Sequence, residues 1–143
     1  MILKVFIDSD IILDVLSKRE PFYDSAVILF SLIEKNKIQG YTSPIVFSNV
    51  NYVLRKRVTK QNTIESLRYL KSLIQILPLD KRVIESALDS QFSDFEDAIQ
   101  YFCAEQNGIK YIITCDKADY EKAEINILTA KEFLSMLQTL SKN

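Results

Sequence analysis

The amino-acid sequence predicts an α/β fold in which helices cover both faces of a central parallel sheet of about five strands. Short apolar runs alternate along the chain with longer segments in which apolar residues recur at helical spacing. Only two glycines and three prolines occur in 143 residues, so no flexible linker is indicated. We therefore expect a single domain over residues 1–143, a length that suits one hydrophobic core.

Strands and helices are predicted in alternation through the first half of the chain. Residues 2–7 (ILKVFI) form a short apolar run that ends at Asp8, which is typical of a buried strand. Ser43 and Pro44 suit the N-cap and the first turn of a helix. The other predicted elements are a helix over 11–17, a helix over 21–36, a strand over 40–43, a helix over 44–57 and a helix over 62–74. The helix over 21–36 places four apolar residues on one face: Ala26, Leu29, Phe30 and Ile33.

The second half continues the alternation. Ser93 and Glu96 match a capping box, which predicts a helix start at Ser93. That helix is expected to end at Asn107 and Gly108, a common left-handed stop. The other predicted elements are a strand over 75–79, a helix over 81–88 capped by Asp80, strands over 109–114 and 125–128, and a terminal helix opened by a second capping box, Thr129 with Glu132.

Aspartates gather where predicted strands end or a helix begins. Asp8 and Asp116 each follow the carboxyl end of a strand, where α/β sheets form their sites. Clustered carboxylates repel one another and need a cation to share a site. Because the chain has no histidine, oxygen ligands favour Mg²⁺ or Mn²⁺, and histidine-dependent catalysis is excluded. The candidate metal ligands are Asp8, Asp94, Asp97 and Asp116, with Asp10 and Asp119 as accessory acids.

Ordinary structural roles compete with these assignments. Asp8 also suits a turn or an N-cap, and Asp10 suits the N-cap of the following helix. Asp94 and Asp97 lie at the start of a helix, where acids stabilise the helix macrodipole. Thr114 is expected to be an accessory residue that orients a neighbouring carboxylate through a hydrogen bond.

Other charged side chains are expected to lie at the surface. Asp14 is predicted to pair with Lys18, one helical turn along the chain. Arg55, Lys56 and Arg57 form a basic run that suits either a solvated helix end or a patch that contacts the phosphates of RNA. The net charge of −1 does not favour a strongly basic nucleic-acid binder.

Membrane and export signals are not evident in the sequence. No apolar run reaches the roughly 18 residues that a membrane span needs. The N-terminus lacks the apolar stretch and cleavage site of a signal peptide. Cys103 and Cys115 do not have the spacing of a metal-binding pair. We therefore expect a cytoplasmic protein that has no membrane partner.

Three acidic blocks in this order resemble those of the PIN-domain family, in particular its VapC-like toxin ribonucleases. The opening FIDSDIILDVL is similar to the family's strand-then-aspartate start, and SDFEDAIQ to its third acidic block. YIITCDKADY is similar to the fourth block, which often ends in Asp-Phe. The resemblance covers nearly the whole chain. It implies a three-layer α/β/α fold, a Mg²⁺- or Mn²⁺-dependent endoribonuclease acting on RNA, an antitoxin partner and a homodimer.

The resemblance also implies roles for individual residues. Asp8 matches the family's first acid, Asp97 its third and Asp116 its fourth, which makes these three the candidate catalytic residues. Asn49 is an accessory candidate because it stands at the place of the second acid. Three positions depart from the family pattern: Asp10, which is commonly Asn, Asn49, which is usually Glu, and Cys115, which is commonly Arg.

Other function classes remain open from the sequence. An Asp8-Ser9-Asp10 segment after a strand also begins the haloacid-dehalogenase-type phosphatases, but their catalytic lysine and glycine-rich acidic block are not evident. A receiver domain should carry a phosphorylatable aspartate after a central strand, which cannot be placed here. The uncharged Asn49 favours a third class, a catalytically inactive PIN-fold binding module.

Overall fold

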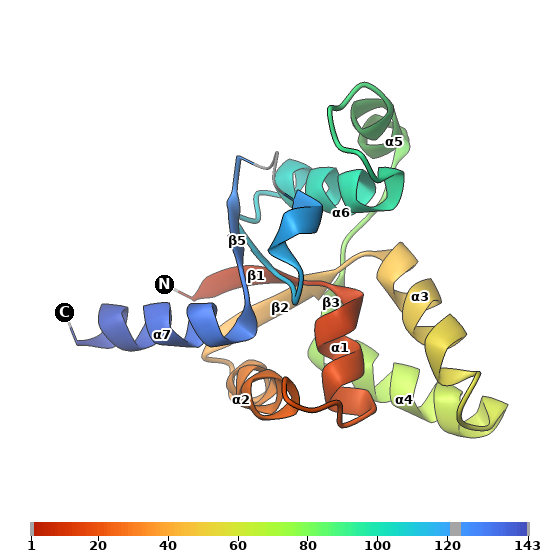
Figure 1. Cartoon of the computed structure of the whole chain (residues 1–143), viewed down its shortest axis with the longest axis vertical. Helices are drawn as coiled ribbons and strands as arrows, with labels where there is room; N and C mark the ends of the chain where they lie inside the picture. Colours follow the sequence, from red (N-terminus) through yellow and green to blue (C-terminus); the bar gives the residue numbers. More distant parts are fainter. Residues whose placement is uncertain (1, 121–123, 143) are drawn as a thin grey trace.

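A computed structural model describes residues 2–120 and 124–142, except for the side chain of Asp119, as an α/β fold built on one sheet (Figure 1). The five strands run in the order β3-β2-β1-β4-β5, and every neighbouring pair is parallel. The strands are β1 (Leu3–Ile7), β2 (Ile38–Thr42), β3 (Gln75–Ile76), β4 (Tyr111–Ile113) and β5 (Asn126–Leu128). The predicted parallel sheet is therefore confirmed.

Helices cover both faces of this sheet and give three layers. They are α1 (Ser9–Leu16), α2 (Tyr23–Glu34), α3 (Pro44–Leu54), α4 (Lys60–Leu73), α5 (Lys81–Leu88), α6 (Phe95–Gln106), the 3₁₀ helix η1 (Lys117–Tyr120) and α7 (Ala130–Ser141). Helix α2 packs against α1 and α7 on one face, α3 packs against α1, and α4 packs against α3, while α5 packs on α6 on the other face (Figure 1). Within the described residues, none of the helices has the length and apolar character needed to span a membrane.

Strand β1 forms the centre of the core. Val5, Phe6 and Ile7 are fully buried, because helices cover the strand on both sides. Gly40 of β2 lets helix α2 lie close to the sheet, since a Cβ atom there would lie 2.8 Å from Cδ1 of Ile33. The four apolar residues predicted on one face of α2 are all buried: Ala26, Leu29, Phe30 and Ile33.

Several of the predicted helix ends are confirmed. The Ser43 hydroxyl accepts a hydrogen bond from the Val46 amide at 3.3 Å, with Pro44 in the first turn of α3. Asp80 caps α5 in the same way. Gly108 follows α6 with a φ of 74°, a left-handed conformation that glycine adopts without strain. The terminal helix opens with the predicted capping box of Thr129 and Glu132.

The predicted capping box at Ser93 is wrong. The N-cap of α6 is Asp94, whose Oδ1 accepts from the Asp97 amide at 2.9 Å. Because Asp94 is the N-cap in place of Ser93, the third residue of the helix is Asp97 and no longer Glu96. The Glu96 carboxylate instead accepts a hydrogen bond from the side-chain amide of Asn49 in α3.

Several element boundaries also differ from the prediction: α1, α2, β2 and β4 are each displaced or shortened by a few residues, and three further cases have a clear cause. Helix α4 begins at Lys60 rather than 62, because the Thr59 side chain caps it by accepting from the Asn62 amide at 3.1 Å. Helix α3 ends at Leu54 instead of continuing to 57. Strand β3 has only two residues, and Pro78, which has no amide hydrogen, lies just beyond it.

Candidate functional site

The sheet order places a topological switch point between β1 and β4. Strand β1 has β2 on one side and β4 on the other, so the connections that leave β1 and β4 diverge from the same edge. The Asp8 amide donates to the Ile113 carbonyl at 3.0 Å, which joins the ends of the two strands. This pairing brings Asp8 next to Thr114, 106 residues away in the sequence.

Asp8 accepts hydrogen bonds from three elements. It is the N-cap of α1, and its Oδ1 accepts from the Ser9 amide at 2.8 Å. Its Oδ2 accepts from the Thr114 hydroxyl after β4 and from the Tyr120 hydroxyl at the end of η1, both at 3.1 Å. These donors fix the carboxylate at the carboxyl edge of the sheet.

Asp10 lies beside Asp8 but has fewer donors. Its Oδ2 accepts from the Cys115 amide at 3.1 Å and lies 3.4 Å from the Thr114 hydroxyl. That hydroxyl carries one proton, so Asp8 and Asp10 compete for it. Among the described residues, no hydrogen-bond partner reaches the buried Oδ1 of Asp10. A buried carboxylate oxygen without a donor is costly, and a bound cation or a proton on the carboxyl group would offset that cost.

Burial makes both carboxylates hard to ionise. Burial raises the pKa of Asp8, against the opposing effect of hydrogen bonds from Ser9, Thr114 and Tyr120, and the negative charge of Glu96 raises it further. Burial, and then the charge of Asp8, raise the pKa of Asp10 to about 6. Two carboxylates that disfavour each other's charge in a buried place are stabilised by a shared cation.

The Asp8–Asp10 pair suits a hard divalent cation. Mg²⁺ is usually held by one or two carboxylates together with water, and Mn²⁺ accepts the same oxygen ligands. Within residues 2–120 and 124–142, no three acidic or cysteine side chains are grouped closely enough to hold a metal ion on their own. The two aspartates are the acids that the edge of the sheet itself brings together.

The other predicted acids lie at the start of α6 and just after β4. Asp97 is in the first turn of α6, and its charge contributes to the raised pKa of Tyr120. Asp94 caps the same helix. Asp116 is exposed just after β4, and its Oδ1 accepts from the Ala118 amide at 3.0 Å. The side chain of Asp119 lies outside the part of the chain that the structure describes.

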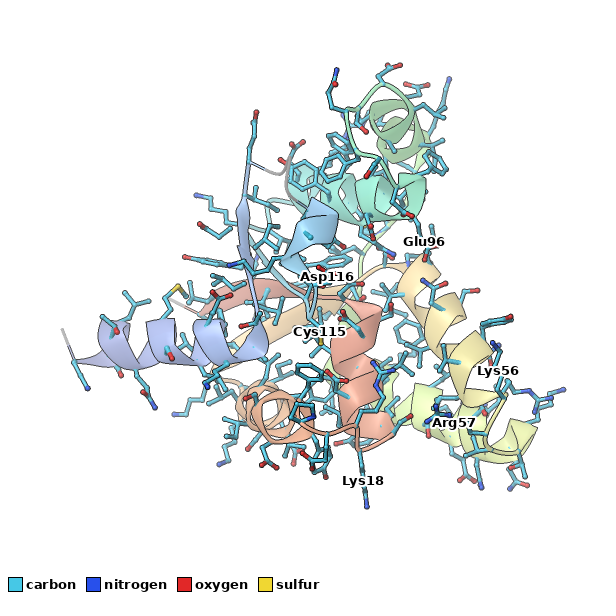
Figure 2. All side chains as sticks on the ribbon, viewed as in Figure 1. Lys18, Lys56, Arg57, Glu96, Cys115 and Asp116 are labelled. Atoms are coloured by element: carbon cyan, nitrogen blue, oxygen red, sulfur yellow. The ribbon has the colours of Figure 1, made fainter. Side chains whose placement is uncertain are left out.

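The basic run is separate from the acidic edge. Arg55, Lys56 and Arg57 follow the end of α3 and are exposed. Figure 2 shows Lys56 and Arg57 at the far end of this helix from Asp116 and Glu96. The Lys56 ammonium lies 4.2 Å from the ring centre of Tyr52, a cation–π contact. The fold therefore does not bring the basic run and the acids together.

Tyr120 is a site residue that the sequence analysis did not single out. Its side chain is 2% exposed, and burial is the main reason that its pKa is raised, so the hydroxyl stays protonated as a donor to Asp8. The only signal in the sequence is that Tyr120 stands where the PIN-like pattern often has Phe. That difference of one oxygen atom gives Asp8 a donor.

Asp14 has a different partner from the one predicted. The Arg19 guanidinium, rather than Lys18, forms an ion pair with Asp14 at 3.0 Å. Lys18 has a φ of 50°, so the chain turns sharply there and returns Arg19 to the helix. The Cys115 thiol also contacts the fully buried Asp14 carboxylate at 3.0 Å.

Known proteins are similar to this chain in both sequence and fold. The PIN domain family matches residues 4–118. Ribonuclease VapC1 of Aquifex aeolicus (strain VF5) is 31% identical over 142 residues, which covers 96% of this chain and 97% of that protein.

Two solved structures are similar in fold. VapBC2 from Rickettsia felis, bound to a DNA fragment from its promoter, has a TM-score of 0.67 at 14% identity, covering 88% of this chain and 97% of the other. A toxin–antitoxin complex from Klebsiella pneumoniae has a TM-score of 0.66 at 21% identity, with the same coverage. With the match over residues 4–118 and the relative at 31% identity, these findings establish that the chain belongs to the PIN-domain family.

Proposed function

We propose that this protein is a metal-dependent endoribonuclease and the toxin of a toxin–antitoxin pair. The observation that carries the proposal is the buried Asp8–Asp10 pair at the switch point of the sheet, where Asp10 has an oxygen atom that no described residue reaches with a hydrogen bond. The 31% identical relative is named a ribonuclease, which supports RNA as the substrate. Its name and those of the solved structures support a toxin with an antitoxin partner.

Asp8 and Asp10 would hold the Mg²⁺ or Mn²⁺ ion, with Asp94, Asp97 and Asp116 around them. When bound, such an ion polarises a water molecule and stabilises negative charge on a phosphodiester. Thr114 and Tyr120 hold Asp8 in place through their hydroxyl groups. Because the chain has no histidine, proton transfer falls to carboxylates and water, and Asp97 and Asp116 are the candidates.

Cleavage of a mixed RNA pool with Mn²⁺ or Mg²⁺ tests this proposal, beside an EDTA control and an Asp8→Asn variant. We expect metal-dependent cleavage that falls by at least about 100-fold in Asp8→Asn, in the range of losses caused by removing catalytic groups. Circular dichroism must show that the variant is folded. Undiminished cleavage by folded Asp8→Asn would contradict the proposal.

A homodimer and a location in the cytoplasm are also proposed for this protein. Light scattering at several protein concentrations tests the dimer, since a monomeric mass throughout would contradict it. Co-expression with a candidate antitoxin should suppress RNA cleavage in the purified complex. Cleavage that is unaffected by the antitoxin would argue against that partner.

An inactive PIN-fold binding module is the second candidate function. Asn49 favours it, because the amide adds no charge to the site and instead donates to Glu96. Mn²⁺ binding without RNA cleavage would select this alternative. The membership in the PIN-domain family leaves no support for the phosphatase and receiver-domain alternatives.

A further inference from the structure

A cavity of about 320 Å³ lies between helices α1, α2 and α7, next to the end of β4. Its volume is at the lower end of the range for small-molecule sites, roughly 300–1,000 Å³. Ile11 and Ala130 line it and are buried, whereas Phe22 stands at its entrance with 52% of its surface exposed. Ser25, half-buried in α2, adds a hydroxyl group. The cavity therefore suits one small molecule, or one base of a nucleic acid, that has an apolar face.

The charge that this cavity offers to a ligand is positive. Asp14 lines it but is fully buried, and its carboxylate is already paired with the Arg19 guanidinium at 3.0 Å and contacted by the Cys115 thiol at 3.0 Å. Lys131 is exposed at the entrance, and the ion pairs among the described residues do not include it. An aromatic ring beside a free ammonium group favours a planar ligand with a negative charge over an amine or a metal ion.

The cavity and the Asp8–Asp10 pair share one wall. Thr114 and Cys115 line the cavity. The Thr114 hydroxyl also donates to Asp8 at 3.1 Å, and the Cys115 amide donates to Asp10 at 3.1 Å. Figure 2 shows Cys115 next to Asp116 and beside α1. Only these two residues at the end of β4 therefore separate a group bound in the cavity from the two carboxylates.

We propose that this cavity binds the base of one RNA nucleotide beside the Asp8–Asp10 pair. The base stacks on the Phe22 ring, in the way that unpaired bases of RNA stack on aromatic side chains. Ser25 offers a hydrogen bond to the edge of the base, and Lys131 neutralises the adjoining phosphate. The inference rests on the proposed function and deepens it, because it gives the RNA substrate a place to bind next to the carboxylates.

NMR titration of the isotope-labelled full chain with each of the four ribonucleoside monophosphates tests the inference. The buffer contains EDTA and little salt, so the measurement involves neither a bound metal ion nor cleavage. Shifts of backbone amide signals locate the bound nucleotide and give its Kd. Ribose phosphate, which lacks the base, is the control ligand that separates binding of the base from binding of phosphate alone.

Two variants remove the proposed contacts, and each has a matched control. Phe22→Ala removes the ring, whereas Phe22→Tyr keeps a ring on which a base can stack. Tyr69→Ala is the control for loss of an exposed ring, since Tyr69 is 46% exposed in α4 and does not line the cavity. Lys131→Ala removes the ammonium group, and Lys35→Ala removes an exposed ammonium group elsewhere. Thermal unfolding checks that every variant is folded.

We expect the amide signals of Ser25, Cys115 and Ala130 to shift, and at least one nucleotide to bind about fivefold or more tightly than ribose phosphate. Phe22→Ala should weaken that binding by about fivefold or more, the effect of removing one stacking contact with a base. Phe22→Tyr and Tyr69→Ala should bind like the wild type. Lys131→Ala should weaken binding and reduce its dependence on salt, whereas Lys35→Ala should not.

Shifts confined to residues outside the cavity would overturn this inference, and so would equal affinities of Phe22→Ala and Tyr69→Ala. Equal binding of nucleotides and ribose phosphate would show a phosphate site without a place for the base, which also overturns it. Failure of the proposed function gives a different result. If the wild type cleaves RNA but nucleotides leave the cavity signals unchanged, only the nucleotide site is wrong. If nucleotides bind in the cavity but folded Asp8→Asn cleaves like the wild type, the nucleotide site stands and the proposed cation site is wrong.

Discussion

Asp8 and Asp10 are close neighbours at the start of α1 but have different surroundings. Asp8 has donors from three elements, which compensate part of its burial. Asp10 has the Cys115 amide and a share in the Thr114 hydroxyl, and its other oxygen has no donor within the described structure. At the scale of single residues, a carboxylate with three hydrogen-bond donors therefore lies beside one with fewer donors. Removing a donor from Asp8 should lower the free energy of unfolding, whereas removing the charge of Asp10 should raise it.

Tyr120→Phe removes one donor from Asp8 and leaves the buried ring in place. We expect the free energy of unfolding at pH 8, without metal, to fall by about 1–2 kcal/mol, because a buried carboxyl group loses a hydrogen bond. The effect should shrink toward pH 4, because burial raises the pKa of Asp8 and so favours its protonated form there. Urea unfolding at the two pH values measures it. Tyr69→Phe is the control, since that ring is 46% exposed. An equal loss in both variants would contradict the role of the Tyr120 hydroxyl.

Asp10→Asn removes the charge of the carboxylate that has fewer hydrogen-bond donors. The pKa of Asp10 is raised from 3.8 to about 6 in the folded protein, so folded molecules hold a proton that unfolded ones release in this range. The free energy of unfolding therefore falls as the pH rises from about 4 to 6, and it stays at this lower value above about pH 6. We expect Asp10→Asn, in metal-free buffer, to lack this loss and to be more stable than the wild type at pH 7.5 by roughly 2 kcal/mol. Parallel stability curves for the two proteins would contradict this.

At the scale of elements, helix ends and one glycine determine how the layers meet. The caps at Ser43, Asp80 and Thr129 fix where α3, α5 and α7 begin. Gly40 lies in β2, between Ile33 of α2 and Ile74 at the end of α4. Since no side chain stands there, both helices approach the sheet closely. The position of α2 depends on that missing Cβ atom.

Gly40→Ala should destabilise the fold by about 1–3 kcal/mol, the usual cost of overfilling a packed core. Its Cβ would lie 2.8 Å from Cδ1 of Ile33. Ile33→Val removes that carbon, so the double variant should lose less stability than the sum of the single variants. Denaturant unfolding of the four proteins tests this. Additive losses would show that crowding against Ile33 is not the cause.

At the scale of the whole molecule, charge is distributed unevenly. The net charge is −1, yet acids collect at the carboxyl edge of the sheet, while Arg55, Lys56 and Arg57 lie at the far end of α3 (Figure 2). RNA bound at the acidic edge would need cations for its phosphates away from the carboxylates. The basic run is our proposed place for them, which makes binding dependent on salt and on RNA length.

Replacing Arg55, Lys56 and Arg57 by Ala, in an Asp8→Asn background that prevents cleavage, should weaken the binding of single-stranded RNA at low salt. The slope of log affinity against log salt concentration should decrease by about 0.7 for each phosphate that the protein no longer neutralises. Lys35→Ala with Lys37→Ala, in the exposed turn between α2 and β2, is the control. Fluorescence anisotropy at several salt concentrations measures both. An unchanged slope in the triple variant would favour the solvated helix end instead.

Local patterns predicted much of the fold and named Asp8 and Asp116 as candidates for the site. The apolar run before Asp8, the face of α2 and the caps at Ser43 and Thr129 are confirmed because each depends on residues close in sequence. Asp8 and Asp116 were selected by their positions after predicted strands, which are also local features. The predictions for Ser93 and for Asp14 with Lys18 were wrong, because the neighbouring Asp94 caps α6 and a turn at Lys18 brings Arg19 to Asp14.

The sequence by itself determined that this chain forms a parallel α/β sheet with aspartates at strand ends, because apolar spacing, caps and strand ends are local properties. Only the tertiary structure decided how those aspartates are supported. Tyr120 reaches Asp8 from 112 positions away, and Asn49 reaches Glu96 from another helix. Such contacts depend on which strands are neighbours in the sheet and on how closely the helices approach one another. Burial, which sets the pKa values of Asp8 and Asp10, likewise exists only once the layers have packed.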